Sequence, residues 1–120
     1  MKRITQEELE VFLRKHKLWL ENKKGGERAD LSRADLSWAN LSGANLSGAN
    51  LDFSTIPLWC GSLKANFDDK QLIQIAYHLV KAGLNSNNAS KETKTELKKL
   101  IDFANKFHRV EECGKIEVQT

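Results

Sequence analysis

Five consecutive units of five residues occupy positions 29–53 of this 120-residue chain, and their period constrains the fold more than any other feature. Each unit has alanine first, Asp or Asn second, leucine third, Ser or Asp fourth and a variable fifth residue. An α-helix repeats its apolar positions about every 3.6 residues and a strand about every 2, so a period of five fits neither. The pattern predicts a tightly wound repeat.

The first and third positions of the units supply the expected core. A tight shaft leaves room for only a small side chain beside each leucine, because extra volume would overpack it. The same register continues for one more unit beyond the fifth. The expected core residues are Ala29, Leu31, Ala34, Leu36, Ala39, Leu41, Ala44, Leu46, Ala49, Leu51 and Ile56.

The units, written A-[DN]-L-[SD]-x, resemble the pentapeptide-repeat family over residues 24–63 at most. This resemblance implies a right-handed quadrilateral β-helix with one unit on each side and about two coils in all. Residues twenty apart then stack, with Arg33 under Phe53 and Asp30 beside Asn50. So short a shaft has two open ends, which need caps.

A capping helix is expected on the N-terminal side, over residues 5–22. Thr5 and Glu8 have the spacing of a capping box, which starts a helix. Gly25 and Gly26 follow two lysines and end it. The repeats begin almost at once afterwards.

Two further helices are expected to form a C-terminal cap over residues 68–109. The first begins at Asp68 and stops at Gly83, and the second begins at a Ser90 cap. The tail over residues 110–120 is predicted to be a short strand or disordered. The chain is therefore expected to be a single domain, mainly a β solenoid with α caps.

Composition and charge exclude several classes of protein. The net charge is only +3 with no basic cluster, so direct nucleic-acid binding is not expected. The N-terminus turns acidic before any apolar run, which predicts a cytoplasmic protein with no signal peptide and no membrane segment. Cys60 and Cys113 are far apart and predict free thiols, with a disulfide as the alternative.

Aromatic residues at the variable positions are the candidate binding surface. Trp38 is expected to lie under Leu58, beside the stacked pair of Arg33 and Phe53. Either the terminal helices cover this group, because exposed apolar patches are uncommon on monomers, or it binds a partner. That partner is expected to be another protein or a second copy in a homodimer. The partner-binding candidates are Trp38, Phe53, Leu58, Trp59 and Arg33.

No catalytic site, cofactor or metal centre is predicted. The weak metal candidates match no common zinc spacing, and nothing marks either thiol as an activated nucleophile. A metal- or thiol-dependent enzyme is the least favoured alternative. The weak candidates are Cys60, His78, His108 and Cys113.

The favoured function is a non-enzymatic protein-binding scaffold or inhibitor. Two alternatives come from the resemblance: a DNA-mimic inhibitor of a DNA-handling enzyme such as gyrase, and an anti-defence protein of a phage or prophage. A DNA mimic needs a long, strongly negative surface. The repeats offer only Asp30, Asp35 and Asp52, partly offset by Arg33.

Overall fold

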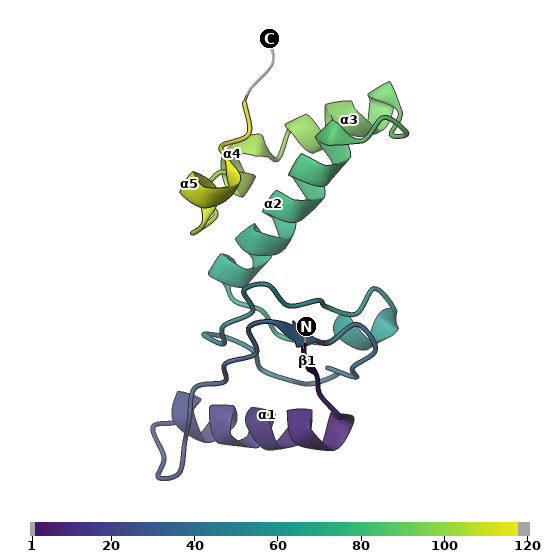
Figure 1. Ribbon diagram of the computed structural model, residues 1–120. Coiled ribbons are helices and arrows are strands. Elements are labelled where there is room, and N and C mark those ends of the chain that lie inside the picture. The colour runs from purple at the N-terminus through teal and green to yellow at the C-terminus, as the bar shows by residue number, and fades with distance from the viewer. Residues whose placement is uncertain (1, 118–120) are drawn as a thin grey trace. The chain divides into compact units, whose positions relative to one another are not determined.

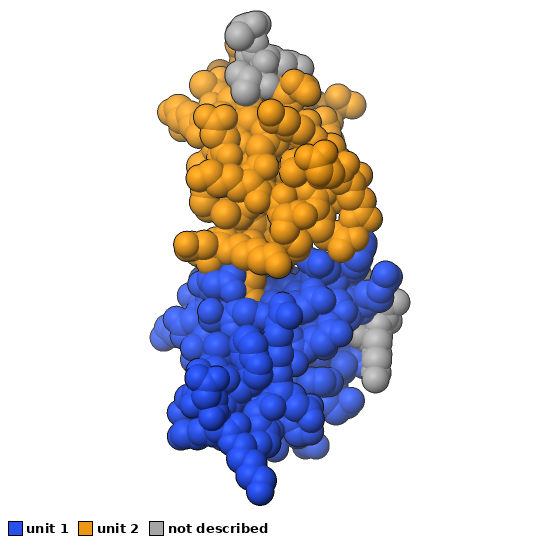
Figure 2. All heavy atoms as spheres, turned by 90° about the vertical axis from the view of Figure 1, so that its left-hand side faces the viewer, with its two compact units in different colours: residues 1–68 blue, residues 69–120 orange. Residues whose placement is uncertain are grey.

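The computed structural model describes residues 2–117 (Figure 1) and forms two compact units, residues 1–68 and residues 69–120 (Figure 2). Each unit has its own apolar core. The first holds the repeats, one long α-helix and a short 3-10 helix, and the second holds the remaining α-helices. The single-domain organisation with a C-terminal cap stays a prediction.

Helix α1, Gln6–Leu20, begins at the capping box that the sequence predicts. The hydroxyl of Thr5 accepts a hydrogen bond from the Glu8 N–H at 3.1 Å, and the Glu8 carboxylate accepts one from the Thr5 N–H at 3.2 Å. Leu9 is fully buried and belongs to the same core cluster as the repeat leucines. The helix therefore packs against the repeats (Figure 1).

Each repeat unit turns the chain through a hydrogen-bonded β-turn. The leucine carbonyl accepts from the N–H that opens the next unit, at 2.9–3.2 Å. The Asp or Asn in second position accepts from the backbone N–H two residues later, as its preference for turns predicts. Two hydrogen bonds per unit thus explain why a five-residue period is stable.

Parallel bridges join successive coils. Asp30 pairs with Asn50 and Asp35 with Thr55, so residues twenty apart lie side by side and the predicted neighbour of Asp30 is confirmed. Asn45 pairs instead with a residue twenty-one positions on, Asn66. One extra residue therefore enters the second coil between Thr55 and Asn66.

The inserted residue interrupts the register that was expected to continue to residue 63. Pro57 lies at the interruption and cannot donate a ladder hydrogen bond. The short 3-10 helix η1, Cys60–Ser62, follows it, and Leu63 is 77% exposed. The repeat pattern therefore does not govern this part of the second coil.

Regular strand is much scarcer than the predicted mainly β class implies. In residues 2–117, strand is limited to β1, Lys2–Arg3, and β2, Ala34–Asp35, which pair in parallel. The rest of the repeat segment consists of turns and isolated bridges. Because each unit spends most of its five residues on a turn, about two residues remain on each side to pair with the next coil.

The second unit is built on α2, Asp69–Asn85, which contacts α3, Lys91–Lys98, and α4, Ile101–Ala104. The predicted stop at Gly83 is wrong, because α2 continues to Asn85. A Cβ atom at Gly83 would lie 2.2 Å from a methyl group of Leu97. This glycine makes room for α3 rather than ending α2.

The second predicted helix of the C-terminal cap, expected from Ser90 onward within residues 68–109, is broken into two. Ser90 caps α3 as expected, accepting from the Thr93 N–H. The amides of Lys99 and Leu100 then bond three residues back rather than four, which tightens the chain before α4 begins. The break lets Ile101 and Ala104 join the core of this unit.

The beginning of the tail is helical, which corrects the expected strand or disorder there. Helix α5, Val110–Cys113, ends at Gly114, whose φ of 96° is in the region that favours glycine. The chain then runs on to Ile116, which is buried in the core with Tyr77. The remainder of the predicted tail, from residue 118, lies outside the described residues.

One open end of the coils is closed by α1 through side-chain hydrogen bonds to backbone. His16 is fully buried, and its Nδ1 accepts from the Ala29 N–H at 3.0 Å. Its Nε2 therefore carries the hydrogen and donates to the Ser47 carbonyl at 2.8 Å. Gln6 bonds both backbone groups of Asn40, at 2.9 and 3.0 Å.

Replacing His16 by leucine should lower the free energy of unfolding by about 2–5 kcal/mol, because a buried N–H and a partly buried carbonyl lose their partners. Gln6→Ala should cost about 1 kcal/mol or less, since water can replace its bonds at an exposed site. Denaturant unfolding followed by circular dichroism measures both. Equal costs for the two variants would contradict the role of His16 in closing the coil.

Candidate functional site

The repeat core occupies the positions that its register specifies. Most of its alanines and leucines are buried, and Ala44 and Ile56 are partly exposed. With the interior filled, the second, fourth and fifth positions of each unit are left to face outward. The buried residues are Ala29, Leu31, Ala34, Leu36, Ala39, Leu41, Leu46, Ala49 and Leu51.

Arg33 and Phe53 stack on neighbouring coils, as the twenty-residue spacing predicts. The Arg33 guanidinium carbon lies 4.6 Å from the centre of the Phe53 ring, which is a cation–π contact. The phenylalanine remains 50% exposed. The two side chains therefore form an outward-facing pair.

Both residues of this pair hold left-handed backbone conformations. The φ angles are 63° at Arg33 and 61° at Phe53, whereas Gly43 and Gly48 occupy the same position in two other units. Such a conformation costs about 1–2 kcal/mol for residues other than glycine. Both side chains thus stand at positions where glycine would have a lower conformational free energy.

Trp38 makes a second contact of the same kind, with a residue that the sequence reasoning did not identify. Arg3, on β1, lies 4.5 Å from the centre of the Trp38 ring. The pairing of β1 with β2 brings Arg3 there, and no repeat signal could have shown it. Trp38 is 38% exposed.

Leu58 and Trp59 lie in the interrupted part of the second coil. Leu58 is 98% exposed. The ring of Trp59 lies over Gly61, and a Cβ atom added there would come within 2.3 Å of the ring, so any other residue would displace it. The described contacts therefore resolve two stacked pairs, Arg33 with Phe53 and Arg3 with Trp38, which we call the arginine–aromatic pairs.

Two carboxylates of the repeats, those of Asp30 and Asp35, accept hydrogen bonds within their own turns. Hydrogen bonds from the side chain and backbone of Ser32 lower the pKa of Asp30 below its ordinary value of 3.8. Ser37, and then Thr55, lower the pKa of Asp35 in the same way. Arg28 also acts on Asp30 and Arg3 on Asp35, so basic groups accompany both acids.

The weak metal candidates are distributed over both units. Cys60 and Cys113 are exposed free cysteines. His78 and His108 each contact the Phe107 ring edge-on, with centroids 5.6 and 4.9 Å away. Among residues 2–117, no three groups of the types His, Cys, Asp or Glu come together in a way that could hold a metal ion.

The comparisons with known proteins identify the repeats. The family model described as pentapeptide repeats (8 copies) matches residues 28–56, and the match ends directly before Pro57. No curated protein and no solved structure matches the chain. None of the helices within residues 2–117 has the length and apolar character needed to cross a membrane.

Acid should destabilise the repeats through Asp30 and Asp35. Because folding lowers both pKa values, these carboxylates stabilise the fold above about pH 4, and that contribution is lost as pH falls through the folded pKa values. The double substitution Asp30→Asn and Asp35→Asn keeps the turn acceptor, as in the asparagine units, and should flatten the decline of unfolding temperature below pH 4.

The matched control for this pH series is Glu10→Gln with Asp102→Asn, which removes the same number of carboxylates from exposed positions. It should leave the decline as steep as in the wild type. If the aspartate variant declines as steeply as this control, the hydrogen bonds from Ser32 and Ser37 do not contribute to acid sensitivity.

Phe53→Gly should change the free energy of unfolding by less than about 1 kcal/mol. Relief of the left-handed backbone offsets the lost arginine contact and the added flexibility of the unfolded chain. Leu51→Ala, in the same unit, should cost about 2–5 kcal/mol because its side chain is buried. A similar loss in both variants, measured by denaturant unfolding, would show that Phe53 is part of the core.

Proposed function

Since residues 28–56 make the chain a pentapeptide-repeat protein, we propose that it acts as a non-enzymatic protein-binding scaffold that uses its arginine–aromatic pairs as the contact surface. We also propose that the repeats wind as a right-handed quadrilateral β-helix of about two coils. The bridges at a spacing of twenty residues, or four units per coil, support that geometry.

The observation that carries the proposal is the backbone conformation of Arg33 and Phe53. Glycine fills the same place in two other units at lower conformational cost, so the turn itself does not require these side chains. Strain of this kind is typical of functional positions, where the side chain serves a purpose beyond folding.

The chemistry of the pairs suits a protein partner. Arginine and aromatic residues dominate the energetics of protein interfaces, because they combine a large apolar area with directional polar contacts. The Arg33–Phe53 pair is held on two bridged coils, so little side-chain freedom remains to be lost on binding. A rigid pair of this kind is a good anchor for an otherwise polar interface.

The DNA-mimic alternative has weaker support. Its surface would need many unneutralised carboxylates at regular spacing. Asp30 and Asp35 accept hydrogen bonds within their own turns and have arginines nearby. The repeat surface thus carries mixed charge, which favours recognition of a protein over imitation of a duplex. An inhibitory role in bacteria or their phages stays a prediction.

Substituting Phe53 by glycine should weaken partner binding by at least about tenfold while the protein remains folded, because the anchor is lost and the turn is kept. Wild-type and variant proteins are used side by side for affinity capture from bacterial lysate. Each partner captured in a reduced amount is then purified and titrated calorimetrically. Trp38→Ala tests the second pair in the same assay.

Val11→Ala is the matched control, since Val11 is an exposed apolar residue of the same unit on α1. It should capture the same partners with unchanged affinity. Light scattering of each purified variant tests the homodimer: dissociation to monomers by Phe53→Gly alone would identify a second copy as the partner. Equal capture and equal mass for all variants would disprove the proposed surface.

A further inference from the structure

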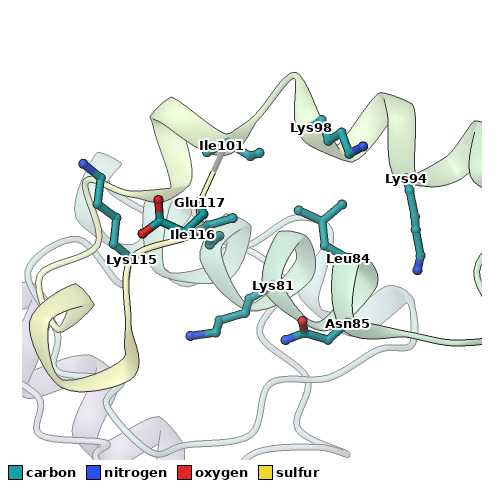
Figure 3. Close-up of a pocket in the computed structure, with 9 residues that line it drawn as sticks. All are labelled: Lys81, Leu84, Asn85, Lys94, Lys98, Ile101, Lys115, Ile116 and Glu117. Atoms are coloured by element: carbon teal, nitrogen blue, oxygen red, sulfur yellow. The ribbon is translucent and has the colours of Figure 1, made fainter. Parts of the chain in front are cut away.

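The second unit contains a pocket of about 320 Å³ between helices α2, α3 and α4 and the segment after α5 (Figure 3). Its volume lies near the lower end of the range for small-molecule sites. We propose that this pocket binds a small organic anion, with a phosphate or carboxylate group at one end and an aliphatic body. The inference is independent of the arginine–aromatic pairs, which lie in the first unit.

The aliphatic part of the lining comes from three core-side residues. Leu84 on α2 and Ile101 on α4 face the pocket, and Ile116 closes it from the C-terminal segment. Ile101 and Ile116 are almost completely buried and belong to the core of this unit. A ligand that enters the pocket therefore meets an apolar floor, which favours an aliphatic body over a bare inorganic ion.

The wall after α5 is fixed by side chains rather than by regular structure. Asn105 bonds both backbone groups of Ile116, at 2.8 and 2.9 Å. The Tyr77 hydroxyl donates to the Gly114 carbonyl, and the Lys81 ammonium donates to the Tyr77 hydroxyl and to the carbonyls of Cys113 and Gly114. The pocket is thus preformed, and Lys81 is already engaged in building it.

Two lysines at the α3 end of the pocket supply the charge for this proposal, and a third lies at the opposite end with its ammonium directed away from them (Figure 3). Lys94 and Lys98 lie one turn apart on α3, and Lys115 lies on the C-terminal segment (Figure 3). Among residues 2–117, their ammonium groups have no hydrogen bond or ion pair, while the nearby Lys99 does pair with Glu96. Glu117 is the one carboxylate in the lining. The excess of lysines over carboxylates in the lining favours an anion.

The lining also argues against a nucleotide base or a nucleic-acid strand as the ligand. Base recognition relies on stacking against aromatic side chains. The nine residues that line the pocket include none. An aliphatic body with an anionic head remains the chemistry that matches both parts of the lining.

Four probes separate these contributions: hexyl phosphate, hexanoate, inorganic phosphate and hexanol. Each is titrated into the isotope-labelled full chain and followed by amide NMR shifts. Hexyl phosphate or hexanoate should bind at least about tenfold more tightly than inorganic phosphate or hexanol, with the largest shifts in α3 and near Ile116. The tighter of the two identifies the anionic group.

The double substitution Lys94→Gln and Lys98→Gln should weaken that binding by at least about tenfold. Lys91→Gln with Lys106→Gln makes the same charge change at exposed positions of this unit outside the pocket, and should leave the affinity unchanged. An equal loss in both variants, equal affinity for inorganic phosphate, or no saturable shift with any probe would overturn the proposal. These readouts do not depend on partner capture by the first unit.

Discussion

The repeats of the first unit depend on satisfying the backbone groups at the open end of a short coil. In a long solenoid most coils lie between two others, but here the terminal coil is a large part of the structure, and each of its amides and carbonyls that is buried without a neighbouring coil needs a substitute partner. His16, Gln6 and β1 supply partners from the N-terminal segment. The helix is therefore a structural complement of the coil as well as a cover for its apolar interior.

Local signals in the sequence were sufficient for the features that depend on a few neighbouring residues. The capping box of Thr5 and Glu8 and the Ser90 cap each need only three or four residues, and both are observed. The spacing that places Asp30 beside Asn50 follows from the period once four units make a coil.

Features set by tertiary packing were not accessible in the same way. Gly83 looks like a helix stop, but it makes space for Leu97 inside a continuous helix. The break before α4 and the burial of Ile116 are set by the core of the second unit. Pro57 marks the place of the extra residue in the second coil in the sequence. A strict five-residue register continues through this proline and therefore does not predict the insertion.

The contacts of the candidate surface likewise include one that the sequence predicts and one that depends on tertiary pairing. The period predicts that the fifth position of each unit points outward and that Arg33 stacks with Phe53. The partner of Trp38 is Arg3, which reaches it only because the N-terminal strand pairs with the repeats. The left-handed backbone at Arg33 and Phe53 could not be predicted from the sequence, since arginine and phenylalanine seldom adopt this conformation.

The turn geometry of the repeats sets a limit on how far this surface can diversify. The first and third positions of each unit form the core, and the fifth faces outward. The fifth residue can therefore change without a change in the packing of the core. Where the backbone is left-handed, each residue other than glycine lowers the free energy of unfolding by about 1–2 kcal/mol, out of a total of about 5–15 kcal/mol. A small solenoid of this kind can therefore carry only a few large side chains at left-handed positions. Glycines such as Gly43 and Gly48 avoid this cost at the other positions.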